Sequence, residues 1–163
     1  MPQAFLVQEA VRLRDAGATA ETIVNRLETL KKQIRAYFVV DDLAHLQRGG
    51  RLSVAQAFVG SFLKIKPVLH FIDGKIVPFE KIRTFKRAVN RIEEMMKEDI
   101  KGDGAGYVIG VIHAEDSMKA EAEIAELTAL FPQARIEMSF FGPVIGTHLG
   151  PGAIGITWYH AAE

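Results

Sequence analysis

The stretch VLHFIDGKIVPF, residues 68–79, decides what kind of sheet this chain builds. Two apolar runs, 68–72 and 75–79, flank Asp73-Gly74, a dipeptide that strongly favours a two-residue turn between antiparallel strands. The stretch therefore predicts a β-hairpin, and with it a sheet that contains at least one antiparallel pair.

N-terminal to this hairpin, the spacing of apolar residues predicts two helices, a strand and one helical turn. Residues 2–16 carry apolar side chains at helical spacing, and Gly17 is placed to end that helix. Thr19 can cap the next helix, so residues 1–34 are expected to form a helical pair. A buried strand is expected over 36–40, followed by a single turn of helix that Gly49-Gly50 stops.

On the C-terminal side, helices and strands alternate irregularly. Thr84 is expected to cap a helix that ends near Lys97, and Asp116 or Ser117 to open another that ends at Leu130. Further strands are expected over 107–112, 134–138 and 155–159. We therefore predict an α+β fold, a mixed β-sheet packed by helices on one face.

Composition narrows the possible functions. At 163 residues the chain is one domain by length, able to bury roughly 70% of its unfolded surface. The absence of cysteine excludes disulfides and thiolate chemistry and fits the cytoplasm, where we expect this protein. No apolar run reaches the ~18 residues of a membrane span. Twenty basic and twenty acidic side chains leave no net charge, which disfavours nonspecific nucleic-acid binding.

Two short loops bracketed by glycine are expected to form the edges of one site. The first presents Arg51, and the second presents Thr147 and His148 ahead of Gly150-Pro151-Gly152. His148 can donate a hydrogen bond to a carboxylate, and Arg51 can hold an anion together with main-chain N–H groups. The alternatives are a structural histidine, a Thr147 that caps a turn, and an arginine that caps the preceding helical turn.

An almost entirely apolar segment, residues 54–63, lies between these loops in the sequence. A helix that is apolar on every side is either buried or faces an apolar cavity. In most proteins such residues are ordinary core, but the position of this segment also suits a tunnel for an acyl chain. The predicted lining is Phe58, Val59, Phe62, Leu63, Leu69 and Phe71.

Evidence for catalysis or metal binding is weak in the sequence. His113, Glu115 and Asp116 stand together, but their spacing and number suit a metal poorly, and helix capping accounts for Asp116. The chain contains neither a nucleophile elbow nor a glycine motif for nucleotide phosphates. We therefore expect a protein that is not an enzyme and needs no metal or cofactor.

Five ordered motifs resemble the DegV family of bacterial fatty-acid-binding proteins. They are DLAHL (42–46) with RGGRLS (48–53), KIKPVL (64–69) with GKI (74–76), KIRT (81–84) and GPVIGTHLGPGA (142–153). The resemblance runs from about Tyr37 to Tyr159 and corresponds to the C-terminal part of a full-length member. It implies that residues 35–163 form a lipid-binding domain, that residues 1–34 link it to an α/β half, and that this half is missing here.

The resemblance also implies a function in lipid metabolism and phospholipid synthesis. A family member binds a long-chain fatty acid such as palmitate, stearate or oleate and presents the carboxylate to a partner fatty acid kinase, which makes acyl phosphate. By the same resemblance, His148 contacts the carboxylate and Arg51 lies near the entrance and the kinase-facing surface. Arg83 and Lys86 belong to a basic cluster that would suit docking of this partner. We expect a monomer.

Two other functions remain open from the residues themselves. Arg51 and His148 also suit an enzyme or regulatory domain that binds a small phosphorylated or carboxylated metabolite. Alternatively, the chain is a fragment with a purely structural role once its other half is removed.

Overall fold

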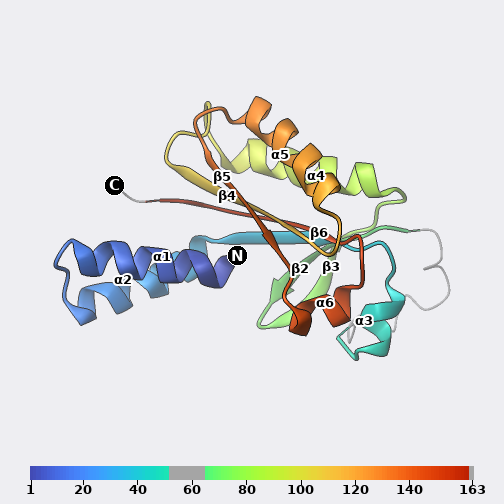
Figure 1. Ribbon diagram of the computed structural model, residues 1–163, viewed down its shortest axis with the longest axis horizontal. Helices are drawn as coiled ribbons and strands as arrows, with labels where there is room; N and C mark the ends of the chain where they lie inside the picture. Colours follow the sequence, from blue (N-terminus) through green and yellow to red (C-terminus); the bar gives the residue numbers. More distant parts are fainter. Residues whose placement is uncertain (52–64, 162–163) are drawn as a thin grey trace.

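The computed structural model describes residues 1–51 and 65–161 (Figure 1). The predicted apolar segment 54–63 therefore lies outside the described residues. The helices are α1 (Pro2–Asp15), α2 (Ala20–Gln33), α3 (Ala44–Arg48), α4 (Phe85–Asp99), α5 (Ser117–Leu130) and α6 (Pro143–Leu149). The strands are β1 (Arg35–Val39), β2 (Val68–Ile72), β3 (Lys75–Glu80), β4 (Tyr107–His113), β5 (Arg135–Phe140) and β6 (Ile154–His160).

The strands form one mixed sheet in the order β3-β2-β1-β6-β4-β5. Among the described strands, the β4–β5 pairing is parallel and the other four pairings are antiparallel. The predicted hairpin is confirmed: Asp73 and Gly74 join β2 to β3 with φ values of 50° and 73°. Two successive positive φ angles match the right-handed twist of the flanking strands. The predicted mixed α+β class is thereby confirmed.

The three helices with predicted caps, α2, α4 and α5, begin where the sequence placed them. Thr19 Oγ1 accepts a hydrogen bond from the Thr22 N–H at 3.2 Å, and Thr84 Oγ1 accepts one from Arg87 at 3.4 Å. Asp116 Oδ1 accepts one from the Lys119 N–H at 3.0 Å. Each cap satisfies an N–H group that has no partner within the helix, so these starts are set by residues close in sequence.

Helices cover both faces of the sheet, so the prediction of helices on one face is wrong. Figure 1 shows α4 and α5 above the sheet, with α1–α2 and α3–α6 at opposite ends of the other side. The central strand β6 explains this arrangement, because Ile154 to Tyr159 are all buried although successive side chains point to opposite faces. A strand buried on both faces needs a cover on each.

Each of the three helix pairs packs on the sheet and forms an apolar cluster with it. The cluster between α4, α5 and the sheet includes Val39, Ile92, Met96, Ile109, Ile156 and Trp158. Phe5 of α1 packs on Tyr159, with ring centroids 4.8 Å apart, and α3 and α6 enclose a third cluster that includes Phe38, Leu46, Leu69 and Leu149. The division into a helical pair and a second domain at residue 34 stays a prediction. None of the described helices is long and apolar enough to cross a membrane.

Candidate functional site

The segment that carries Thr147 and His148 is a helix, not the loop that the sequence analysis expected. Pro143 occupies the first turn of α6, a position where its fixed φ and missing N–H are tolerated. Gly146 lies inside the helix, where glycine costs about 1 kcal/mol relative to alanine. Gly142, Gly146 and Gly150 concealed this helix in the sequence. His148 consequently lies in the last turn of α6, followed by Gly150 with a φ of 75°.

Helices α3 and α6 interlock through two histidines and two glycines. A Cβ atom on Gly49 would overlap Nδ1 of His148 and lie 3.1 Å from its Cε1. Reciprocally, a Cβ on Gly150 would lie 2.5 Å from Cδ2 of His45. Contacts this short leave no room for a side chain, so each histidine ring rests on the backbone at the C-terminal end of the other helix. The position of His148 therefore depends on α3 as well as on α6.

Arg51 makes the contact expected of a capping arginine. Its Nη1 donates a hydrogen bond to the Gly49 carbonyl oxygen at 3.2 Å, at the C-terminal end of α3. The guanidinium is exposed and has further N–H donors, so this contact leaves it able to meet an anion as well. Gly49 thus contacts both predicted head-group residues, with its Cα against His148 and its carbonyl oxygen bonded to Arg51.

These residues line one cavity of about 260 Å³ between the β2–β3 hairpin and α6. Its side chains are of two kinds, and together they suit a ligand with an anionic end and an apolar part. The basic ones are Arg51, Lys75 and His148, and the apolar ones are Phe71, Ile76, Ile145 and Leu149. Arg51 and His148, which the sequence analysis expected beside each other, both line this cavity. Their role in binding stays a prediction.

Lys75 is a lining residue that the sequence analysis did not select. The signal was present, because Lys75 directly follows the hairpin turn and belongs to the motif GKI. Of the predicted residues that the structure describes, Thr147 and Leu69 lie outside the lining. Thr147 Oγ1 donates to the Val144 carbonyl oxygen at 3.1 Å within α6, and Leu69 is fully buried in the cluster with Phe38. These contacts are those of the structural alternatives, and a part of Thr147 or Leu69 in binding stays a prediction.

The remaining predicted residues lie elsewhere. Phe58, Val59, Phe62 and Leu63 fall outside the described residues, so their role as tail lining stays a prediction. Arg83 and Lys86 are exposed, Arg83 before α4 and Lys86 in its first turn. A cation in the first turn of a helix faces the positive end of the helix dipole, which is unfavourable by a few tenths of a kcal/mol.

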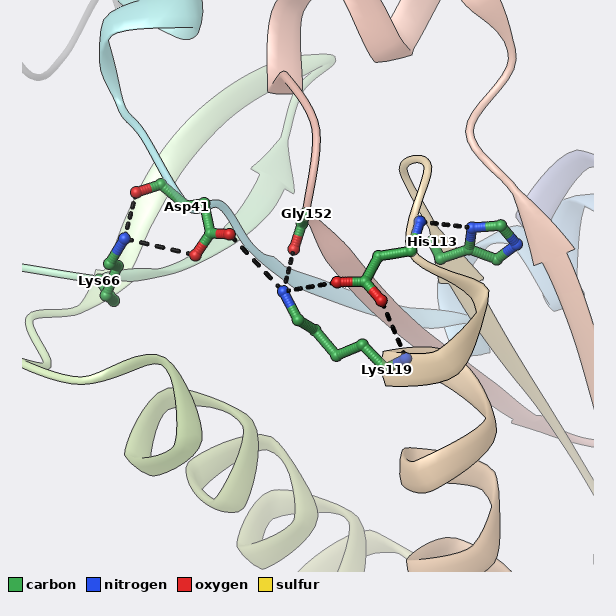
Figure 2. A network of polar contacts seen from close by, with 6 residues as sticks. Asp41, Lys66, His113, Lys119 and Gly152 are labelled. Atoms are coloured by element: carbon green, nitrogen blue, oxygen red, sulfur yellow. Dashed lines mark hydrogen bonds and ion pairs between the residues drawn. The ribbon is translucent and has the colours of Figure 1, made fainter.

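A polar network links the chain segment before α3 to the segment after α6 (Figure 2). The Lys119 ammonium donates to the Gly152 carbonyl oxygen at 3.0 Å and lies 3.2 Å from Asp116 Oδ2 and 3.6 Å from Asp41 Oδ2. Lys66 donates to the Asp41 carbonyl oxygen and lies 3.4 Å from Oδ1 of the same residue. The backbone N–H of Lys119 and its ammonium hold the pKa of Asp116 below its usual range.

The suspected metal residues serve other purposes here. Asp116 caps α5, and its backbone N–H donates to His113 Nδ1 at 3.3 Å. Within residues 1–51 and 65–161, no three histidine or acidic side chains are grouped so as to hold a metal ion.

Comparison with known proteins identifies the family. The model of the DegV family, described as uncharacterised proteins, matches residues 1–161, and the chain therefore belongs to this family. Protein DegV of Bacillus subtilis is 54% identical over 159 residues, which are 97% of this chain and 56% of that protein. The chain thus spans a little over half the length of this relative. The family predicted from the motifs is confirmed.

Two solved structures place this fold among proteins described as binding fatty acids. The crystal structure of DegV from Bacillus subtilis, described as a fatty acid binding protein, superimposes with a TM-score of 0.87 at 52% identity. That match covers 98% of this chain and 56% of the other. A fatty acid binding DegV family protein from Streptococcus agalactiae gives a TM-score of 0.84 at 40% identity, over 99% of this chain and 56% of that one.

Proposed function

We propose that this chain is the part of a fatty acid carrier that receives the carboxylate end of a long-chain fatty acid. The observation that carries the proposal is the cavity in which Arg51, Lys75 and His148 face the same space as Phe71 and Ile145. The fatty acid binding described for its relatives at 52% and 40% identity supports it. Palmitate, stearate and oleate are the proposed ligands.

The cavity has the size to hold the head-group end of such a ligand. Ligand pockets usually measure roughly 300–1,000 Å³, so the described volume of about 260 Å³ suits only part of a long acyl chain. Exposed apolar side chains continue beside it, with Phe71 48%, Ile145 39% and Val144 76% exposed. We propose that the tail follows this apolar surface and that Phe58, Val59, Phe62 and Leu63 complete its cover.

The acyl tail and the head group are expected to contribute different amounts to the binding free energy. Burying sixteen carbons at ~0.8 kcal/mol each offers about 12 kcal/mol before association costs, whereas one hydrogen bond to a carboxylate adds about 1–3 kcal/mol. The tail therefore sets most of the affinity, and His148, Arg51 and Lys75 set where the carboxylate lies. A fixed carboxylate is what a second protein needs in order to react with it.

The proposed second protein is a fatty acid kinase that converts the presented carboxylate to acyl phosphate, for phospholipid synthesis in the cytoplasm. The carrier itself would then be a monomer without catalytic residues or a cofactor. Arg51, Arg83 and Lys86 are the proposed docking residues, and the unfavourable place of Lys86 at the start of α4 supports a role other than helix stability. Reversing the charge of Arg83 should slow acyl phosphate formation while oleate affinity stays unchanged.

Calorimetric titration with oleate tests the binding function. The His148→Ala protein should bind oleate more weakly by about 1–3 kcal/mol, because a hydrogen bond to the carboxylate is lost. Thr147→Ala is the matched control: it changes the neighbouring residue of the same helix, whose hydroxyl bonds within α6, and should leave affinity unchanged.

Two results would overturn the proposal. Equal oleate affinities of the wild-type and His148→Ala proteins would remove His148 from the site. A wild-type protein that binds no oleate, but binds a small phosphorylated or carboxylated metabolite, would favour the enzyme or regulatory domain instead.

A further inference from the structure

The two helices that border the cavity both connect to the network around Lys119. Helix α3 starts shortly after Asp41, and the Ala44 N–H donates to Asp42 Oδ1 at 2.8 Å as the chain turns into it. Helix α6 ends at Leu149, three residues before Gly152. Asp41 therefore lies where the chain leaves the sheet toward α3. Gly152 lies where the chain returns to the sheet after α6.

The ammonium group of Lys119 contacts both of these segments. It donates to the Gly152 carbonyl oxygen at 3.0 Å and lies 3.6 Å from Asp41 Oδ2. Asp116 Oδ2, at 3.2 Å, is the third partner, and the ammonium lies 4.3 Å from the centre of the Phe85 ring. One hydrogen bond and two ion pairs, each to a different segment, therefore hold the ammonium in place (Figure 2).

Gly152 makes this junction tight. Its φ is 78°, and a Cβ atom there would overlap Oδ2 of Asp41. Its N–H donates to the Ala114 carbonyl oxygen at 2.8 Å, which anchors the turn to the end of β4. Lys66 holds Asp41 from the other side. Removing the Lys119 ammonium would leave the Asp41 carboxylate and the Gly152 carbonyl without the cation that both contact.

We propose that Lys119 is a positioning residue for the head-group end of the cavity. It sets the separation of α3 and α6, and these helices meet where the His148 ring rests on Gly49 and Arg51 bonds the Gly49 carbonyl. A shift of either helix would change both contacts. This inference rests on the proposed function for its effect on ligand affinity, but its structural part concerns the ligand-free protein.

The test combines NMR of the histidine rings with oleate titration. Lys119→Met keeps the length of the side chain and removes its charge, whereas Lys119→Arg keeps the charge. The control is Lys31→Met, on the remote and exposed surface of α2. It removes the ion pair in which Lys31 Nζ lies 2.9 Å from Glu28 Oε1. The His148 ring signals are assigned by comparison with His148→Gln.

Lys119→Met should shift the His148 ring signals of the ligand-free protein and weaken oleate binding about fivefold to tenfold, as expected when a binding group loses its support. Lys119→Arg should restore both, and Lys31→Met should change neither. Unchanged His148 signals in a folded Lys119→Met protein would overturn the proposal. So would shifted signals that Lys119→Arg does not restore.

A second variant covers the case in which Lys119→Met does not fold. Asp41→Asn keeps the shape of the side chain and removes the charge between Lys66 and Lys119. It should shift the same His148 signals, and unchanged signals would refute the role of the network. If the wild-type protein binds no oleate, the proposed function fails, while the ring signals of the ligand-free variants still decide the role of Lys119.

Discussion

Helices α4 and α5 contain 15 and 14 residues and cover one face of the sheet with a continuous apolar core. Helices α3 and α6, with 5 and 7 residues, pack against each other at one end of the other face, and we call this region the α3–α6 corner. Their contact consists of histidine rings over glycine backbone beside a cavity, with exposed apolar side chains around it. The first region has the features that stabilise a domain, and the second has the features of the proposed binding site.

This difference shows how the chain can keep an apolar corner exposed. The largest of the three apolar clusters lies between α4, α5 and the sheet, and the burial of its side chains favours folding. The α3–α6 corner can then leave Phe71 and Val144 exposed, as a site for an apolar ligand requires. We therefore expect substitutions under α4–α5 to change stability and substitutions at the corner to change binding.

The largest effect is expected for Trp158→Ala, beneath α4. Trp158 is 2% exposed, and its indole N–H donates to Asp99 Oδ2 at 3.2 Å. Removing a buried Trp side chain typically lowers the free energy of unfolding by about 3–5 kcal/mol. Val144→Ala, in α6 at a residue that is 76% exposed, should stay within about 0.5 kcal/mol of wild type. Urea denaturation measures both, and similar losses would contradict the division between the regions.

A smaller effect, dependent on pH, is expected for Glu123 between α4 and α5. Its burial, followed by the nearby Glu93 and Glu126 carboxylates, raises its pKa to about 7 from 4.5. The folded state therefore binds this proton more tightly than the unfolded state. The resulting stabilisation is complete below pH 4.5, is lost as the pH rises to about 7, and stays lost above it.

Glu123→Gln should remove this pH dependence. The variant should match wild type near pH 4.5 and exceed its free energy of unfolding at pH 8 by on the order of 2 kcal/mol. Urea denaturation between these pH values measures the difference, with the exposed Glu121→Gln on the same helix as the control. A difference that does not vary with pH would show that the pKa of Glu123 is the same in the folded and unfolded states.

The smallest effect on stability is expected at the corner, for alanine at two glycines. Gly49 has a φ of −76°, which alanine adopts freely, so Gly49→Ala tests mainly the overlap with His148, with the His45 carbonyl oxygen a further tight neighbour at 3.2 Å. We expect a loss of about 1 kcal/mol from this overpacking together with weaker oleate binding. At Gly146 the nearest atom to a Cβ is the Phe141 carbonyl oxygen at 3.6 Å, so Gly146→Ala should stabilise α6 by up to about 1 kcal/mol.

A double variant distinguishes the overlap from other effects of Gly49→Ala. Combining it with His148→Ala removes the ring that the new methyl group would meet, so the two changes should cost less together than the sum of each alone. Thermal unfolding of the four proteins provides this comparison. Additive losses would mean that His148 does not rest on Gly49.

The comparison between the regions also separates what the sequence predicted from what it did not. The hairpin at Asp73-Gly74 and the caps at Thr19, Thr84 and Asp116 were predicted correctly. The motifs also predicted the DegV family, which is confirmed. Turn and cap chemistry acts between residues a few positions apart, so the local sequence contains all the partners involved.

The α3–α6 corner was only partly predictable. The sequence indicated Arg51 and His148 as neighbours of one site, but it assigned α6 to a loop and did not select Lys75. Glycines lower helix propensity locally, and here the packing of α6 against α3 outweighs that preference. Helices on both faces were missed for a similar reason, since the irregular order of elements does not state which face each helix covers.

By itself, the sequence determined most of the elements, the caps of α2, α4 and α5, the antiparallel hairpin and the family to which the chain belongs. Only the tertiary structure decided that His148 rests on Gly49 and that Lys119 joins Asp41 to Gly152. The physical reason is distance along the chain: Lys119 and Gly152 are 33 residues apart. A contact of that kind depends on how the sheet brings strand ends together, which no local pattern of residues contains.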